Sequence, residues 1–338
     1  MGVRSFLVLA LASAAFAAPL SLTANEEDSA AAGKFQFFGI NESGPEFGEK
    51  KFPGIKNKDY VWPELSTIDT FLKKGMNTIR VNFLMERLVP NQLTGKMDEV
   101  YLKDLKTTVD YITRKNAYAM IVPHNYGRYY EKIITSPSDF ETYWRTTATP
   151  FKGDDKVIFD TNNEYHDMDQ SLVQQLNQAA INGIRAAGAN TQYINAEGNS
   201  WSGAWTWVSS GNGASLVSLR DPANKLMYQM HQYLDQDGSG SHAECVSSTI
   251  GVERLKAATA WLKQNKKMGV LGEFAGGDNP QCKTAVKGML EYMKQNSDVW
   301  KGAIWWAAGP WWADYMFSLE PGKGKAVGPY LDLISSYA

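Results

Sequence analysis

The sequence predicts an α/β protein with one domain, a (β/α)8 TIM barrel, and three observations support this fold. Short apolar runs rich in β-branched residues alternate with longer amphipathic runs, which is the pattern of βαβ units. The short runs recur at intervals of roughly 33–44 residues, the scale of one βα repeat. Eight such runs are present in 338 residues, which favours a closed barrel over an open sheet.

The predicted strands share an apolar body and a polar or aromatic end. In chain order they cover 34–40, 78–83, 119–123, 157–161, 192–197, 225–230, 268–272 and 302–306. Amphipathic spacing predicts helices between them, over 66–74, 102–115, 170–187, 252–264 and 283–295. For the helix over 170–187, we expect Asp169 to be the N-cap and Gly188 to end the helix.

The first residues have the features of a secretion signal. Arg4 gives a positive start, a short apolar run follows, and Ala15-Phe16-Ala17 offers a small-x-small cleavage site. The apolar run is too short to cross a bilayer, and no later segment is apolar enough to do so. We therefore expect a secreted, extracellular protein with a signal peptide over 1–17, a pro-segment or flexible N-terminus over 18–33, and one catalytic barrel over 34–338.

Composition narrows the range of partners. The net charge of −2 and the pI near 6.1 argue against a nucleic-acid partner, which would need a basic face. The chain holds 11 Trp and 16 Tyr, and each indole N–H and phenol O–H needs a hydrogen-bond partner when it is buried. A tryptophan-rich core is one interpretation, and a sugar-binding cleft lined by aromatic faces is the favoured one.

The two cysteines, Cys245 and Cys282, are an even pair in a chain that we expect to be secreted. This context favours one disulfide, and two buried free thiols are the alternative. Two cysteines alone do not make a structural zinc site.

Barrel enzymes carry their chemistry at the C-terminal ends of the strands, so the strand ends are candidate site positions. These ends hold mostly polar side chains, as expected for a cleft and not for a core: Asn41, Glu42, Arg80, Asn82, His124, Asn125, Tyr126, Asn162, Asn163, Glu164, Glu197, Asn199, His231, Tyr233, Glu273 and Trp306.

Glycoside cleavage needs two carboxyl groups across the bond that breaks, one protonated and one ionised. Glu42, Glu164, Glu197 and Glu273 are candidates at strand ends, and Asp160 lies inside the fourth predicted strand. Glu164 and Glu273 follow the fourth and seventh strands, which face each other across an eight-stranded barrel. We therefore favour these two as the pair.

Eight sequence blocks together are specific, although none is so alone. They are GINESG (39–44), IRV (79–81), PHNYGRY (123–129), FDTNNEYHDMD (159–169), EGNSW (197–201), MHQYLD (230–235), LGEFAGG (271–277) and WAAGPWW (306–312). On these blocks the chain resembles glycoside hydrolase family 5, the cellulase family A, from about residue 35 to the C-terminus. It is most similar to the secreted fungal endo-β-1,4-glucanases of that family.

The resemblance implies a retaining hydrolase that cuts internal β-1,4-glucosidic bonds of cellulose and related β-glucans through a covalent glycosyl-enzyme intermediate. Glu164 matches the acid/base of the family and Glu273 matches its nucleophile. Mannan, xyloglucan and mixed-linkage glucan are alternative substrates, because relatives that act on other β-glycans share the same catalytic residues.

Further roles follow from the same resemblance. Asn163 matches the residue that bonds the sugar 2-hydroxyl, and Arg80 matches the arginine that supports the nucleophile, although a structural ion pair is its alternative role. The subsite where cleavage occurs is expected to be lined by His124, His231, Tyr233 and Trp306. Independently of the resemblance, Trp201, Trp205 and Trp207 follow a strand end at alternating spacing, which favours the rim of a cleft. We expect Trp201 and Trp205 at outer subsites and favour a similar place for Trp207, with the core as the alternative for all three.

The chemistry of these residue types agrees with the implied roles. Arg80 beside Glu273 would keep that carboxyl ionised, and partial burial of Glu164 would hold its proton near neutral pH. His166 is either a surface histidine or a residue that positions Glu164. Asn195 and Ala196 stand where two larger apolar residues are usual, and we expect looser packing there.

Two other kinds of function are less well supported. A metal-dependent barrel hydrolase would need clustered ligands such as His-x-His, and the chain has none. A non-catalytic sugar-binding barrel would have lost one of the two glutamates. We expect no metal, no cofactor, no membrane or nucleic-acid partner, a polysaccharide substrate and a monomer.

Overall fold

The computed structural model describes residues 1–2, 33–312 and 314–338. Nearly all of the expected signal peptide (1–17) and pro-segment (18–33) lies outside the described residues. Among the residues that are described, no helix combines the length and apolar character needed to cross a membrane.

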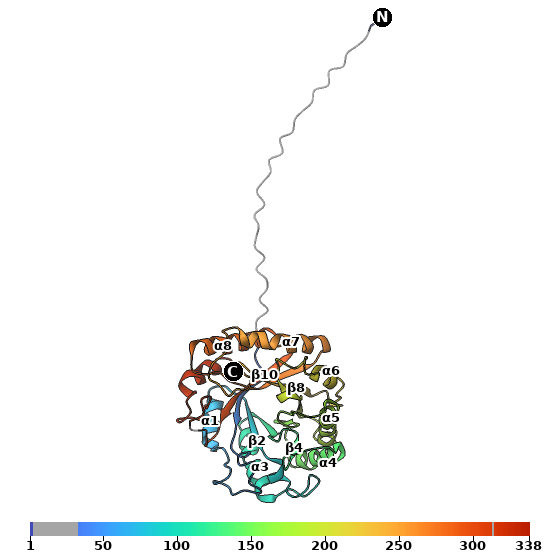
Figure 1. The fold of residues 1–338 in the computed structure, drawn as a ribbon, viewed down its shortest axis with the longest axis vertical. Helices are drawn as coiled ribbons and strands as arrows, with labels where there is room; N and C mark the ends of the chain where they lie inside the picture. The colour runs from blue at the N-terminus through green and yellow to red at the C-terminus, as the bar shows by residue number, and fades with distance from the viewer. Residues whose placement is uncertain (3–32, 313) are drawn as a thin grey trace. The chain divides into compact units, whose positions relative to one another are not determined.

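The predicted barrel is confirmed. Eight parallel strands close on themselves in the order β1-β10-β9-β8-β7-β6-β3-β2, with the helices around them (Figure 1). The strands are β1 (Phe37–Glu42), β2 (Thr78–Phe83), β3 (Tyr118–Pro123), β6 (Val157–Asp160), β7 (Tyr193–Glu197), β8 (Leu226–Gln232), β9 (Met268–Phe274) and β10 (Trp300–Ala308).

The five predicted helices are present, with ends shifted by up to three residues. They are α1 (Leu65–Lys73), α3 (Glu99–Thr113), α5 (Gln170–Ala186), α7 (Ile250–Asn265) and α8 (Pro280–Gln295). The Asp169 side chain caps α5 by accepting from the amides of Ser171 and Leu172, as expected. Gly188 follows α5 with a φ of 93°, a conformation that favours glycine after a helix.

Several elements were not predicted. They are α2 (Met85–Leu88), α4 (Pro137–Ala148), α6 (Asn212–Leu216), α9 (Asp332–Ser335), single turns over Thr149–Phe151, Ser200–Ser202 and Val327–Leu331, and a hairpin of β4 (Arg128–Tyr129) and β5 (Lys132–Ile133). The largest, α4, packs closely on α5. Gly183 permits this approach because it has no Cβ, and a Cβ there would lie 2.2 Å from the carbonyl oxygen of Glu141.

The predicted ends of four strands were wrong in a way that concerns the site. We expected strands to end at 40, 230, 272 and 306, but β1, β8, β9 and β10 run two residues further. The ladder between β8 and β9 continues through the pairs His231–Glu273 and Gln232–Phe274. Backbone pairing therefore extends past the point where the apolar pattern stops, so these polar side chains stand on strands and not on loops.

The barrel interior has two layers with different chemistry. The period-2 alternation of a strand places Ile158 and Asp160 on the same face, and likewise Met227 and Gln229. The apolar layer consists of Phe37, Met120, Ile158, Met227, Val270 and Ile304, all fully buried. The polar layer lies further along the strands and consists of Asn41, Arg80, Asp160, Asn195, Glu197 and Gln229, also fully buried.

The predicted disulfide joins Cys245 and Cys282, 37 residues apart, and is confirmed. Cys245 lies in the loop after β8, and Cys282 lies in the first turn of α8. Because α8 follows β9, the bridge ties together the segments that follow two neighbouring strands of the barrel.

Candidate active site

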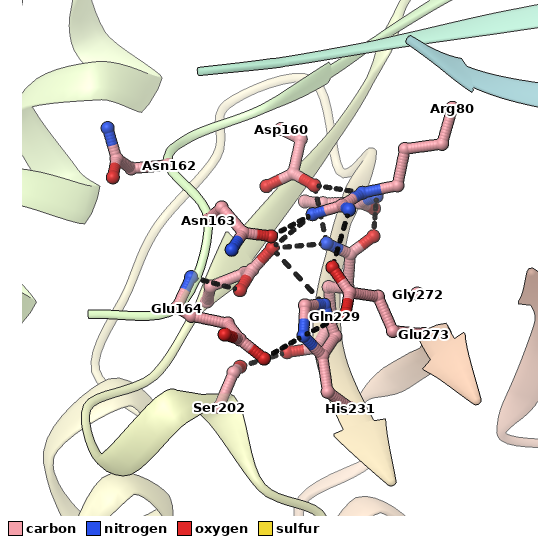
Figure 2. A network of polar contacts seen from close by, with 12 residues as sticks. Arg80, Asp160, Asn162, Asn163, Glu164, Ser202, Gln229, His231, Gly272 and Glu273 are labelled. Atoms are coloured by element: carbon pink, nitrogen blue, oxygen red, sulfur yellow. Dashed lines mark hydrogen bonds and ion pairs between the residues drawn. The ribbon is translucent and has the colours of Figure 1, made fainter. Parts of the chain in front are cut away.

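The two glutamates expected to form a catalytic pair lie next to each other. Glu164 stands four residues after the end of β6, and Glu273 lies near the end of β9. These two strands are not opposite each other as expected, because only β7 and β8 lie between them in the barrel. One carboxylate oxygen of each, together with a ring nitrogen of His231, lie within 4.8 Å of one another. Figure 2 shows both carboxyl groups directed toward His231. The two carboxyl groups are therefore close enough to act on the same bond of a bound substrate.

Glu273 is held by a cation and a phenol. Arg80 Nη1 donates to its Oε1 at 3.0 Å, and the Tyr233 hydroxyl donates to its Oε2 at 2.7 Å. Burial and the neighbouring charge of Glu164 raise the pKa of Glu273 above its ordinary value, although the charge of Arg80 and the hydrogen bond from Tyr233 oppose this. His124 Nε2 lies 3.9 Å from Oε1. Each oxygen of this carboxylate therefore has a fixed direction.

Glu164 has a different environment. Its backbone amide donates to Glu197 Oε2 at 2.8 Å, and its Oε1 lies 2.7 Å from His231 Nδ1. Its φ is 48°, in the left-handed region. Burial raises the pKa of Glu164 to about 7, against the opposing charge of Arg80. Below that pH the carboxyl is protonated, and its side chain, 15% exposed, remains within reach of a ligand.

Arg80 supports Glu273 from inside the polar layer. It is fully buried, and although burial disfavours its charge, the surrounding carboxylates outweigh this and raise its pKa. Its nitrogens donate to side chains of four strands and of the segment after β6 (Figure 2): Asp160 Oδ2 (3.1 Å), Glu197 Oε1 (3.0 Å), Glu273 Oε1 (3.0 Å), Asn41 Oδ1 (2.9 Å) and Asn163 Oδ1 (2.7 Å).

Asn163 offers a free donor beside the pair. Its Oδ1 is occupied by Arg80, which turns the Nδ2 group the other way. Within residues 33–312 and 314–338, that buried Nδ2 has no hydrogen-bond partner. A buried donor without a partner is costly, so its orientation is consistent with the expected bond to a substrate hydroxyl.

The two histidines of the expected cleavage subsite are neutral. Burial lowers the pKa of His231 to about 4 and that of His124 well below its ordinary value. The ring of Trp306 stacks with that of His124, with centroids 5.5 Å apart and planes at 24°. Trp306 and His124 therefore form one wall of the site, and Arg80 is its permanent cation.

Trp201 and Trp205 are exposed, and the core alternative is wrong for both. They are 51% and 48% exposed and line a cavity of about 630 Å³ that also includes Glu164, His231 and Tyr233. For Trp207 the favoured position at the cleft rim is wrong, because its side chain is fully buried in the core.

Neighbouring side chains brace both exposed rings. The ring of His166 stacks on Trp201, with centroids 4.7 Å apart and planes at 6°. The guanidinium of Arg254 lies 4.3 Å from the ring centroid of Trp205. The His166 ring is directed to Arg128 and Asp167, so its contacts support Trp201 and not the Glu164 carboxyl.

In the part of the chain that the structure describes, two groups of side chains have ligand atoms close enough for a metal ion. Glu164, His231 and Glu273 form one group, and Asp235, Asp237 and His242 form the other. In the first, Glu273 is already bonded to Arg80 and Tyr233. In the second, the Asp235 carboxylate accepts from the amides of its own loop, including those of residues 240 and 241. We derive no metal-dependent step from either group.

Sequence reasoning missed the part that the polar layer plays in the site. Glu197 was a candidate without a role, and Gln229 was not considered, although it shares a strand face with His231 at the period-2 spacing that would have indicated it. We expected loose packing at Asn195, where a polar side chain would need a partner. The side chain is fully buried, and among the described residues its donor has a partner but its Oδ1 has none. Its Nδ2 bonds Gln229 Oε1 at 3.0 Å, so the polar residue has a partner in the same layer.

Comparisons of sequence extend over most of the chain. A family model described as Cellulase (glycosyl hydrolase family 5) matches residues 30–309. The probable endo-beta-1,4-glucanase B of Aspergillus oryzae is 55% identical over 337 residues, 100% of this chain and 99% of the relative. The endo-beta-1,4-glucanase B of Emericella nidulans is 54% identical over 338 residues, again 100% of this chain and 99% of the relative.

Comparisons of structure agree with those of sequence. The structure of XacCel5A in complex with cellopentaose matches with a TM-score of 0.86 at 39% identity, covering 90% of this chain and 99% of that one. The structure of Cel5A (EG2) from Hypocrea jecorina matches with a TM-score of 0.79 at 28% identity, covering 88% of this chain and 98% of that one. The similarity therefore includes the whole barrel.

Proposed function

The chain belongs to glycosyl hydrolase family 5, and we propose that Glu164 and Glu273 use its retaining chemistry to cut internal β-1,4-glucosidic bonds of cellulose and related β-glucans. The observation that carries this proposal is the close approach of the two carboxylates, within 4.8 Å between oxygens. Retaining enzymes separate their carboxyl groups by about 5–5.5 Å, and inverting enzymes need about 6.5–9.5 Å to admit a water.

In the first step, Glu273 attacks the anomeric carbon and the bond to the leaving oxygen breaks. Arg80 and Tyr233 hold the attacking carboxylate in one orientation, which lowers the entropic part of the barrier. Glu164, with a pKa of about 7, carries the proton that the leaving oxygen receives. The product of this step is a glycosyl ester on Glu273.

In the second step, the roles reverse at Glu164. Ester formation removes the negative charge of Glu273, and the loss of a neighbouring negative charge favours ionisation of Glu164. Glu164, now ionised, takes a proton from water as the water oxygen attacks the anomeric carbon. The ester bond breaks, Glu273 leaves as a carboxylate, and the sugar keeps its β configuration after two inversions.

Two measurements on the purified enzyme test this function. Proton NMR during the first minutes on cellopentaose should show the β-anomer before mutarotation. Side-by-side assays on cellulose, mannan, xyloglucan and mixed-linkage glucan should show the highest kcat/KM on the β-1,4-glucan. An α-anomer as first product would contradict the retaining mechanism, and a preference for mannan or xyloglucan would contradict the substrate.

Replacing Trp201 by alanine should raise KM for long cellooligosaccharides by about 10-fold, with kcat changed by less than about 2-fold, because stacking at an outer subsite is similar in ground and transition states. Steady-state kinetics on cellopentaose measures both constants. The matched control is Trp311→Ala, an exposed tryptophan outside the lining of that cavity, for which we expect a smaller change. Unchanged kinetics in Trp201→Ala would remove this residue from the substrate path.

Secretion and a monomeric state belong to the same proposal. The signal-like start of the chain supports secretion, and N-terminal sequencing of protein from culture medium should find a start at or after Ala18. Sedimentation of the mature protein should give the mass of one chain. Recovery of intact Met1 from the medium, or a dimer mass, would contradict these points.

A further inference from the structure

We propose that Glu197 is a positioning residue for the acid/base glutamate, and that it couples the placement of Glu164 to that of Glu273 through Arg80. The proposal rests on the roles assigned above to Glu164 and Glu273. Glu197 is fully buried and takes no part in the chemical steps. Through the position of Glu164 it nevertheless controls the first of those steps.

Glu197 is the last residue of β7, and its two carboxylate oxygens accept hydrogen bonds from two different residues of the site. Its Oε2 accepts from the backbone amide of Glu164 at 2.8 Å. Its Oε1 accepts from Arg80 Nη2 at 3.0 Å, and Arg80 Nη1 in turn donates to Glu273 Oε1 at 3.0 Å. A chain of three hydrogen bonds therefore runs from the backbone of the acid/base to the carboxylate of the nucleophile.

The backbone at Glu164 needs such support. The ladder of β6 ends at Asp160, and Glu164 lies beyond it with a φ of 48°. Left-handed backbone is unfavourable for a residue with a Cβ and persists where surrounding contacts determine it. Because the amide orientation and the Cα–Cβ direction change together, the bond to Glu197 also aims the Glu164 side chain.

The donors around Glu197 require an ionised carboxylate and not an amide. Besides Glu164 and Arg80, Gln229 Nε2 donates to Oε1. The Gln229 amide cannot turn round, because its own Oε1 accepts from Asn195 Nδ2 at 3.0 Å. Three N–H groups therefore point at Glu197, and a glutamine there would direct its NH2 group at one of them. Burial and Asp160 raise the pKa of Glu197 well above its ordinary value, although Arg80 and the amide of Glu164 oppose this. The ionised form is therefore assigned from the three donors that converge on its oxygens.

Asp160 provides a matched control within the same layer. It is equally buried, and its Oδ2 accepts from Arg80 Nε at 3.1 Å and from Gln229 Nε2. Among the contacts of the described residues, none joins the Asp160 carboxylate to Glu164. A change at Asp160 therefore disturbs Arg80 and the nucleophile, whereas a change at Glu197 also releases the acid/base.

The test compares kcat/KM on two substrates that differ in their need for an acid. Cellopentaose has a poor leaving group that must be protonated, and 2,4-dinitrophenyl β-cellobioside has a leaving group that departs without a proton. For Glu197→Gln we expect a loss of about 100-fold on cellopentaose and less than about 5-fold on the aryl cellobioside, the low end of what a general acid contributes. For Asp160→Asn we expect equal losses on both substrates.

Folding is controlled in the same experiment. A 2-deoxy-2-fluoro-cellobioside with an activated leaving group traps the nucleophile as an ester without help from an acid. The trapped fraction therefore counts the correctly folded sites, and all rates are divided by it. Glu197→Asp, which keeps the charge but is one methylene shorter, should show the same dependence on leaving group. Equal losses on both substrates, or no folded protein from either variant, would overturn the proposal and leave Glu197 a structural residue.

This outcome is distinct from failure of the proposed function. If the unmodified enzyme does not cleave cellopentaose, or if Glu164→Ala itself shows equal losses on both substrates, the assignment of the acid/base is wrong. If Glu164→Ala depends on the leaving group and the Glu197 variants do not, the assignment stands and only the positioning role is wrong.

Discussion

Replacing Glu273 by alanine is expected to lower kcat on cellooligosaccharides by on the order of 10⁵–10⁶-fold, the scale seen when a catalytic nucleophile is removed. The variant lacks the atom that forms the covalent intermediate, and Arg80 and Tyr233 lose the carboxylate that they orient. The space left by the side chain opens the face of the sugar opposite Glu164. Azide should enter there and yield an α-glycosyl azide from an activated cellobioside.

Product analysis by NMR with and without azide measures this effect. Glu291→Ala, which removes an exposed carboxyl on α8, is the control and should keep its activity. A β-glycosyl azide from the Glu273 variant, or activity within about 100-fold of the unmodified enzyme, is incompatible with a nucleophile at this position.

Replacing Glu164 by alanine is expected to lower kcat/KM on cellopentaose by about 10³-fold and to leave that on 2,4-dinitrophenyl β-cellobioside within about 10-fold, because only the first substrate needs a proton on its leaving group. The pH profile should change as well. Glu164 must be protonated in the free enzyme, so activity on cellopentaose should fall as the pH rises through about 7, the pKa of this carboxyl. That basic limb should be absent from the variant.

Rates on both substrates between pH 4 and 9 measure the loss and the limb together. Azide should restore turnover of the aryl cellobioside and give a β-glycosyl azide, since the intermediate on Glu273 still forms. Persistence of the same basic limb in Glu164→Ala would assign it to another group, and equal losses on both substrates would exclude Glu164 as the acid.

The fold was predictable because the signals that specify it are local. Apolar runs of four to eight residues and amphipathic spacing located each barrel strand and five helices. The helix α4 was missed, although Ser136 and Pro137 form an N-cap followed by a first-turn proline, a known start signal. The ends of β8 and β9 were missed because backbone pairing continues through His231 and Glu273, where side-chain polarity no longer indicates a strand.

The candidate site was predictable only as a set of strand ends. Position at or near the C-terminal end of a predicted strand identified Glu164, Glu273, Arg80 and His231, and the structure brings them together. Their partners were not predictable, because a hydrogen bond between Glu197 and an amide 33 residues away depends on the backbone angle of Glu164. The exposure of Trp201 and Trp205, beside buried Trp207, likewise depends on loop geometry and not on spacing.

The two layers of the barrel interior have a consequence for engineering. Buried ion networks are expensive to desolvate, and apolar replacements of similar volume often stabilise a protein by about 1–4 kcal/mol. A search for thermostable variants that scores melting temperature alone would therefore favour replacement of Arg80, Asp160 and Glu197. The selected barrels would be thermostable but inactive. Improved packing belongs instead at the opposite end, where Met120 and Met227 fill the apolar layer with flexible side chains.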